Sequence, residues 1–190
     1  MKVTKVQASE NRRVLVRAAG KLFRQHGING VGVADIGKSA GLTHGAIYAR
    51  FPSKQALAAE ALAEGTRQIV DVMRSCVTNP TIDDYLDFSL SKRSRDNLVG
   101  GCPLTASGSE IARQGKIVSR AFAEGFEELA LALQDVLDES DDTTVRERAL
   151  AIAAAEIGTL IIARAVAKAK PALSDEILAA SRRVLGEIAK

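Results

Sequence analysis

Several residue types that mark common protein classes are scarce in this chain of 190 residues. It contains no tryptophan, two cysteines, two histidines and four prolines. Two isolated cysteines cannot form the disulfide framework of a small secreted protein, and two distant histidines without a zinc-type cysteine pair make no convincing metal cluster. We therefore expect no bound metal or cofactor, and reduced thiols at Cys76 and Cys102.

Long hydrophobic runs are also missing. The longest, residues 149–163, is interrupted by Glu156 and is shorter than the roughly 18 unbroken apolar residues that a membrane span requires. No apolar signal segment follows Met1. The sequence therefore predicts a cytoplasmic protein that does not associate with a membrane.

Positive charge is concentrated at the N-terminal end. Residues 1–54 contain ten Lys or Arg and two Asp or Glu, whereas residues 55–190 contain 16 basic and 21 acidic side chains. A basic segment on an acidic body favours a polyanionic partner such as nucleic acid. Charge alone leaves one alternative open, a solvated lysine-rich tail.

Hydrophobic spacing is helical nearly everywhere, and no segment alternates as a strand does. We predict an all-α protein of about nine helices: a helix-turn-helix domain over residues 1–54, joined by a long helix to a helical bundle over residues 55–190. The expected helices run from Ser9 to Gly27, around Val33 to Ala40, from Thr43 to near Phe51, after Ser53, after Thr81, from Cys102 to about Gln114, and over about 116–139, 143–170 and 174–189.

A helix-turn-helix pattern lies within residues 33–54. Such a motif needs a small residue where its helices touch, a residue that tolerates a left-handed turn, and an apolar anchor in the second helix. Gly37, Gly41 and Ile47 occupy these places in order. The polar side chains then face outward near helix N-termini, where phosphate groups are favoured.

The stretch DIGKSAGLTHGAIYARFPSKQAL, residues 35–57, resembles the TetR family of bacterial transcriptional regulators. The signature is a helix-turn-helix followed by a tyrosine, an aromatic residue and a lysine that opens the fourth helix, here Tyr48, Phe51 and Lys54. The resemblance covers about residues 9–60. It implies a one-component repressor that binds palindromic operator DNA as a homodimer and is released by a small-molecule effector.

The resemblance also assigns roles to single residues. Only His44 among the expected base-reading residues has a strong hydrogen-bonding group, so DNA shape and phosphate contacts should carry much of the affinity. Taken singly, His44 could be a solvated histidine and Tyr48 a half-buried core aromatic. The expected base-reading residues are His44, Gly45, Ala46 and Ala49, and the expected phosphate contacts are Val33, Thr43, Tyr48, Arg50 and Lys54.

By the same resemblance, residues 55–190 bind the effector. A carboxylate in the middle of an apolar helix, as at Glu156, must be paired, exposed or facing a cavity, and a buried one favours a cationic or hydrogen-bond-donating effector. Bulky residues at helical spacing are more often core than pocket. The candidate pocket residues are Met73, Tyr85, Phe88, Cys102, Phe122, Phe126, Glu156 and Thr159.

The last two predicted helices carry more apolar surface than one bundle needs, which favours a two-fold partner. The alternative is that the same side chains complete a core within one chain. The candidate interface residues are Leu150, Ile157, Leu160, Ile161, Ile177, Leu178 and Leu185.

Cys102 lies at a predicted helix N-terminus, where the helix dipole lowers a thiol pKa and favours a reactive thiolate. The alternative is a small buried residue in a tight loop. A helical thiol enzyme or hydrolase built on Cys102 with a distant histidine is the competing function. No nucleophile, base and orienting group can be assembled from the sequence, so we expect no catalytic residues.

Overall fold

The computed structural model describes residues 5–75, 81–137 and 142–189. These residues form ten α-helices and one 3₁₀ helix, without a strand, which confirms the all-α prediction. Cys76 and the expected end of the helix over about 116–139 lie outside the described residues. The elements are α1 (Lys5–His26), α2 (Val33–Ala40), α3 (His44–Tyr48), α4 (Lys54–Ser75), α5 (Ile82–Ser89), α6 (Lys92–Asp96), α7 (Pro103–Ser107), η1 (Ile111–Arg113), α8 (Lys116–Gln134), α9 (Asp142–Ala167) and α10 (Pro171–Ile188).

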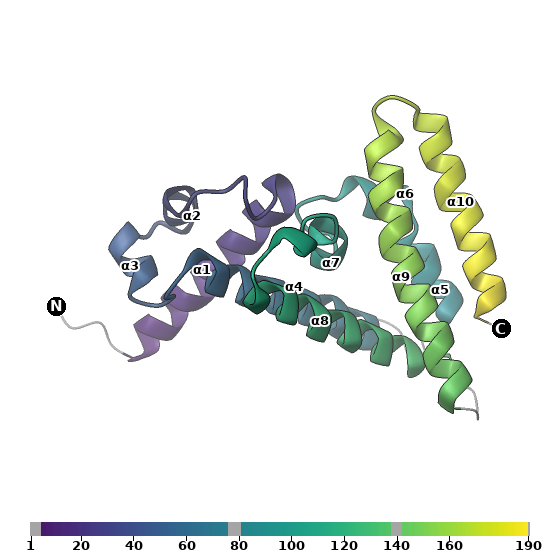
Figure 1. Cartoon of the computed structure of the whole chain (residues 1–190), viewed down its shortest axis with the longest axis horizontal. Coiled ribbons are helices and arrows are strands. Elements are labelled where there is room, and N and C mark those ends of the chain that lie inside the picture. Colours follow the sequence, from purple (N-terminus) through teal and green to yellow (C-terminus); the bar gives the residue numbers. More distant parts are fainter. Residues whose placement is uncertain (1–4, 76–80, 138–141, 190) are drawn as a thin grey trace.

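The helices form a small N-terminal head and a larger body (Figure 1). Helices α1 to α3 make the head, while α4 and α8 run side by side away from it. Helices α9 and α10 pack along each other at the opposite end, and the short α7 fits between α1, α4 and α9. The body thus contacts the head through α4 and through α7.

Local sequence signals account for several helix ends. Gly27 ends α1 with a left-handed backbone, φ 75°, and its N–H donates to the Phe23 carbonyl at 2.9 Å. Ser53 Oγ accepts from the Ala56 N–H at 3.1 Å at the start of α4. Thr81 and Asp84 cap the start of α5 reciprocally, as in a capping box.

Three predicted boundaries are wrong. Helix α1 begins at Lys5 rather than at Ser9, because no glycine or proline interrupts the residues before Ser9. The single helix expected from Cys102 to Gln114 is two short ones, since the chain turns at Gly108, packed close to Ile161 of α9. The helix expected after Thr81 ends at Ser89, and the charged residues that follow form a separate helix, α6, which Ser91 caps by accepting from Ser94 N–H.

Helix α9 is long and apolar enough, over Thr144–Ala167, to cross a membrane by length and composition. A core helix passes the same test, and α9 packs against α8 and α10 with 39% of its apolar window buried. Glu156 lies buried at its middle. These contacts favour an α9 that packs against other helices of the protein rather than against lipid. One apolar face of α9 is not covered by those helices.

The hydrophobic core runs without a break from the head into the body. Leu15, Ile36 and Phe51 fill the head, and the same cluster continues through Leu57 and Leu104 into α8 and α9. The head is therefore not held by its helix-turn-helix contacts alone, because the body supplies part of its packing.

Candidate nucleic-acid interface and ligand cavity

The turn between α2 and α3 has the geometry that the sequence predicts. Gly41 adopts a left-handed backbone, φ 64°, and ends α2. A Cβ built on Gly37 would lie 2.8 Å from the Leu42 carbonyl oxygen and 3.2 Å from Ile47 Cδ1. Only glycine allows this approach. Ile47 is buried beneath the turn and anchors α3 to the head.

Thr43 sets the start of α3, the second helix of the motif. Its side-chain oxygen accepts from the Ala46 N–H at 3.3 Å, which confirms the predicted N-cap. Of the residues predicted to read bases, His44, Gly45 and Ala49 are exposed and Ala46 is half-buried. Helix α3 thus presents a small surface to solvent. Among the residues predicted to read bases, the His44 imidazole is the one side-chain hydrogen-bond donor, and the other side chains are short.

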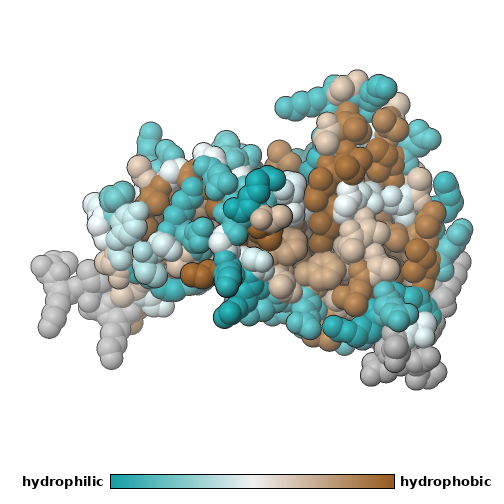
Figure 2. Space-filling model, in the orientation of Figure 1, coloured by the Kyte–Doolittle hydropathy of each residue, from teal (hydrophilic) through white to brown (hydrophobic). Residues whose placement is uncertain are grey.

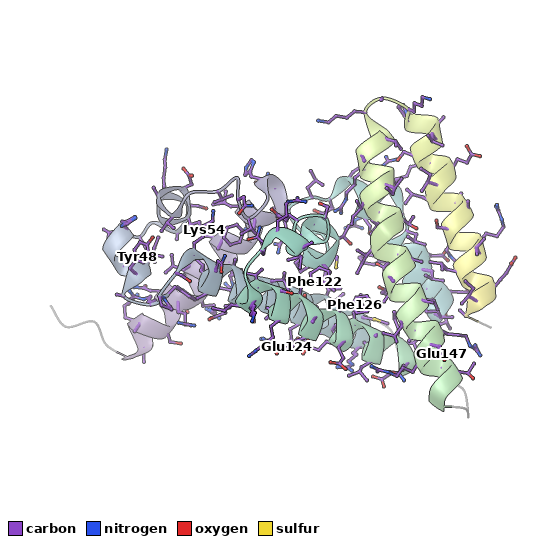
Figure 3. The ribbon with its side chains drawn as sticks, in the orientation of Figure 1. Tyr48, Lys54, Phe122, Glu124, Phe126 and Glu147 are labelled. Atoms are coloured by element: carbon purple, nitrogen blue, oxygen red, sulfur yellow. The ribbon has the colours of Figure 1, made fainter. Side chains whose placement is uncertain are left out.

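Figure 3 shows Tyr48 on α3, at the outer end of the head, and Lys54 at the start of α4. The Tyr48 side chain is 48% exposed, and its ring packs against the His44 ring with centroids 4.9 Å apart. Lys54 is the first residue of α4 and half-buried, and Val33, the first residue of α2, packs partly against the core. Tyr48 is neither in the hydrophobic core nor among the residues packed against it, which disfavours the alternative of a half-buried core aromatic.

Arg50 turns back onto α3. Its Nη1 donates to the Ala46 carbonyl at 2.7 Å, and its buried Nε has no partner among the described residues. The guanidinium therefore satisfies the C-terminal end of α3, where a cation is favoured. A phosphate contact by Arg50 requires this side chain to leave Ala46, and its role at DNA stays a prediction.

Arg12 of α1 fixes the joint between α3 and α4, which the sequence analysis missed. Its Nη1 donates to the Arg50 carbonyl at 2.8 Å, its Nε donates to Glu60 Oε1 at 2.8 Å, and its guanidinium stacks on the Phe51 ring at 4.2 Å. Its partners lie 38 to 48 residues away, so no local spacing in the sequence signals this bridge.

The body contains a cavity of about 60 Å³ between α4, α5, the loop after α6, and α9. It brings together Tyr85, Phe88, Cys102 and Glu156, four of the eight predicted pocket residues. Its wall also includes Ile69, Ser89, Asn97, Leu160 and Arg164, which the sequence analysis did not predict. Loop backbone and single polar residues lack a periodic signal, which is why they were missed.

Three of the remaining predicted pocket residues, Met73, Phe122 and Phe126, pack against the hydrophobic core. Figure 3 shows the two phenylalanines on the side of α8 that faces α7 and α9, away from Glu124. Thr159 Oγ1 instead donates to Ser181 Oγ at 2.9 Å, between α9 and α10. These four residues do not line the cavity described here.

Glu156 and Tyr85 form a buried pair in this cavity. The Tyr85 hydroxyl donates to Glu156 Oε2, and Glu156 is 4% exposed. Burial raises the pKa of Glu156 to about 7, although the Tyr85 hydrogen bond acts in the opposite direction. Burial, followed by the neighbouring Glu156 charge, raises the pKa of Tyr85 well above its usual value. Of this pair, Glu156 is the group that changes charge near neutral pH.

The Cys102 thiol is not activated as the sequence pattern predicts. Burial, followed by the charge of Glu156, raises its pKa, and α7 contains only five residues, so a helix-dipole effect is small. The neutral thiol is the dominant form at neutral pH. The structure therefore favours the alternative of a small residue packed in a tight loop.

Four of the seven predicted interface residues, Ile157, Leu160, Leu178 and Leu185, are buried within the chain. They have little surface left for a partner. Other apolar side chains on the last two helices are exposed, and Figure 2 shows the resulting hydrophobic surface over α9 and α10. We call this surface the α9–α10 face. It carries Ala151, Ala155, Gly158, Ile162 and Ala165 of α9, and Leu173, Val184 and Ile188 of α10.

Besides the bonds from Arg12 to Glu60, two hydrogen bonds among the described residues join the head to the body. Arg24 Nε of α1 donates to the Val99 carbonyl at 2.5 Å, in the loop that continues into the cavity wall. The Ile28 N–H donates to Glu110 Oε1 at 2.8 Å. Arg164, on the other side of the loop, donates to the carbonyls of Ser94 and Arg95. Residues near the cavity are thereby connected to both the head and α9.

Residues 15–61 match the family described as "Bacterial regulatory proteins, tetR family". The chain is 40% identical over 57 residues to the HTH-type transcriptional regulator AcrR of Shigella flexneri, a match that covers 30% of this chain and 26% of AcrR. It is 25% identical over 173 residues to the HTH-type transcriptional regulator LmrA of Bacillus subtilis, covering 86% of this chain and 92% of LmrA.

Solved structures share the fold over nearly the whole chain. Reduced NemR of E. coli superposes with a TM-score of 0.75 at 19% identity, covering 94% of this chain and 96% of NemR. A TetR transcriptional regulator of Legionella pneumophila superposes with a TM-score of 0.76 at 18% identity, covering 100% of both chains. The similarity of fold therefore extends beyond the head to the body.

Proposed function

We propose that the chain is a member of the TetR family of transcriptional regulators and a one-component repressor acting in the bacterial cytoplasm; the match over residues 15–61 and the shared fold support this. Two copies of the head would bind a palindromic DNA operator, and the body would bind a small-molecule effector that releases the DNA. The observation that supports DNA binding most directly is the exposed α3, capped by Thr43 and flanked by Tyr48 and Lys54.

DNA contacts by this surface would consist mainly of contacts to phosphate. Apart from Tyr48, the side chains facing out from α3 are His44 and short residues, so few base edges can be read by hydrogen bonds. The Tyr48 hydroxyl and the Lys54 ammonium would contact the DNA backbone. Sequence preference would then come from His44 and from the shape of the groove.

Dimerisation would occur through the α9–α10 face. Small residues along α9, including Gly158, where an added Cβ meets nothing within 4 Å, allow a second helix to approach closely. Ile162 and Val184 supply apolar area that is about half exposed in one chain. A homodimer would set the spacing of the two heads to successive half-sites, which lie about 34 to 36 Å apart.

Effector binding would act on the head through the contacts that border the cavity. The loop carrying Val99 also supplies Gly100, Gly101 and Cys102 to the cavity wall. A ligand that displaces this loop would move the Val99 carbonyl and with it Arg24 of α1. A ligand shifts the equilibrium only by binding one arrangement better than the other.

The DNA-binding proposal is tested by the salt dependence of duplex binding. Lys54→Ala removes one phosphate contact, so it should weaken binding to all duplexes nearly equally and reduce the slope of log K against log salt by about one unit. The measurement is fluorescence anisotropy with a labelled duplex at several salt concentrations. The operator for this assay would be selected from a random duplex pool.

Lys168→Ala is the matched control, because Lys168 is an exposed lysine of the body, in the turn between α9 and α10. It should leave the slope unchanged. An unchanged slope for Lys54→Ala would remove Lys54 from the phosphate contacts. A wild-type protein that retains no duplex even at low salt would contradict the proposed function as a whole.

A further inference from the structure

Glu156 is an unusually isolated carboxyl group. It lies in the middle of α9 and is 4% exposed, yet Tyr85 is its one hydrogen-bonding partner among the contacts of the described residues. A carboxylate can accept about four hydrogen bonds, so one donor leaves most of this capacity unused. An ionised carboxylate in such surroundings is costly unless a cation or further donors reach it.

The other ionisable groups around the cavity do not supply that cation. Tyr85 from α5 and Cys102 before α7 both have raised pKa values and are neutral at neutral pH. Arg164 lies eight residues further along α9, about 12 Å along the helix axis, and donates to backbone carbonyls of α6. Arg24 donates to the Val99 carbonyl on the head side.

The rest of the cavity is mostly apolar and small. Ile69, Phe88 and Leu160 form apolar walls, and the buried Ser89 Oγ has no partner among the described residues. The volume of about 60 Å³ is well below the roughly 300 to 1,000 Å³ of pockets for drug-sized ligands. A cavity of this size and lining suits a small molecule with an apolar part and few polar atoms.

We propose that this cavity binds a small apolar primary amine, whose ammonium group pairs with the Glu156 carboxylate while its hydrocarbon part lies against Ile69, Phe88 and Leu160. Its role as the effector rests on the proposed function above. The ammonium supplies both the missing charge and the missing donors, whereas a carboxylic acid of the same shape would bring a second negative charge to Glu156.

Binding should depend on pH because the amine needs an ionised Glu156. Since the pKa of Glu156 in the free protein is about 7, about half of the sites must lose a proton on binding at neutral pH. The affinity should rise between about pH 6 and about pH 8, and proton release should decrease over the same interval. Calorimetry in buffers of different ionisation enthalpy measures both quantities.

The probes are ethylamine, ethanol and acetate, which share a two-carbon skeleton and differ in the group that meets Glu156. Ethylamine should bind the wild-type protein roughly tenfold or more tightly than ethanol, since hydrogen bonds to charged groups are the stronger ones. Acetate should bind least. Equal affinities for the amine and the alcohol, or no binding of the amine, would overturn the proposal.

Variants locate the site. Glu156→Gln keeps the shape and should remove both the preference for the amine and the pH dependence, while Tyr85→Phe should move the rise in affinity to higher pH. Thr159→Val is the control, because Thr159 is on α9 but bonds to Ser181 outside the cavity. If Glu156→Gln retains the amine preference, the ammonium does not bind at Glu156, and the proposal fails.

Duplex binding, measured separately by anisotropy, distinguishes this proposal from the function it rests on. Amine binding that releases duplex supports both. Amine binding without any change in duplex affinity would retain the amine site and overturn its role as effector. A protein that binds no duplex would overturn the proposed function, while calorimetry alone would still decide whether the cavity binds the amine.

Discussion

The buried Glu156 carboxyl should make the stability of the protein depend on pH. Folding raises its pKa from 4.5 to about 7, so the folded state holds this proton more tightly than the unfolded state does. The corresponding stability is present below about pH 4.5 and is lost as the pH rises through about 7. At most, the loss is about 3 kcal/mol at alkaline pH.

Glu156→Gln should therefore be more stable than the wild type at about pH 8, by up to about 3 kcal/mol, and the difference should shrink towards about pH 5. Urea unfolding at fixed protein concentration and several pH values measures this. Glu147→Gln is the control, because Glu147 is an exposed carboxylate on the same helix (Figure 3). A difference for Glu156→Gln that stays constant with pH would contradict the assignment.

At the scale of residues, the sequence predicted well those positions whose role is set by near neighbours. Gly41 and Thr43 act on the turn in which they lie, and Glu156 was expected to be paired, exposed or facing a cavity. The arginines Arg12 and Arg24 were not anticipated, because their acceptors are carbonyls 38 and 75 residues away. Any residue can supply a backbone carbonyl as a hydrogen-bond acceptor, so no pattern of residue types in the sequence indicates such a bond.

At the scale of elements, the contact between α2 and α3 should be sensitive to one methyl group. Gly37→Ala places a Cβ about 2.8 Å from the Leu42 carbonyl oxygen, so the two helices must move apart. The expected cost is about 1 to 3 kcal/mol of unfolding free energy. Thermal and urea unfolding, together with duplex binding, measure the effect on stability and on the placement of α3.

Gly45→Ala is the matched control for this substitution. Gly45 lies in α3, where an added Cβ meets nothing within 4 Å, so alanine should stabilise the helix by up to about 1 kcal/mol. Equal destabilisation by Gly37→Ala and Gly45→Ala would show that the close approach at Gly37 is not the cause.

The ends of helices were predictable where a capping residue or a helix-breaking residue lies in the local sequence. The prediction was wrong where packing against distant segments determines where a helix ends. The end of α1 at Gly27 follows from its left-handed backbone. The break after α7 depends instead on contacts with distant segments, since Gly108 packs near Ile161 and Glu110 reaches Ile28. Similarly, α6 is held by Arg95, which pairs with Asp175 of α10 at 2.8 Å.

At the scale of the whole molecule, the α9–α10 face should determine whether the protein is a dimer. Ile162→Glu places a charge on a surface that would be buried between two copies, so the variant should be monomeric at concentrations where the wild type is dimeric. Sedimentation equilibrium measures the mass. Ile117→Glu is the control, because Ile117 is exposed on α8 away from this face. Equal masses for wild type and Ile162→Glu would contradict this interface.

The division of the chain into residues 1–54 and 55–190, expected from charge, is not a division of the hydrophobic core. Charge separates the two parts, but the side chains between α1, α4 and α7 join them. Such long-range packing leaves no mark in composition. The dimer interface was difficult to predict for the same reason. Apolar residues of α9 and α10 were expected to form it, but the sequence does not distinguish residues buried within one chain from residues buried between two chains.

The unbroken core has a consequence for how the chain melts. If the first 54 residues share their interior with the remainder, they should not fold when expressed as an isolated fragment, and the intact chain should show one calorimetric transition instead of two. Two separated heat-absorption peaks, or a fragment with the helical circular dichroism of the parent, would mean that each part is thermodynamically autonomous. In a chain that melts as one cooperative unit, a change in packing at one end would alter the packing at the other without a hinge between them.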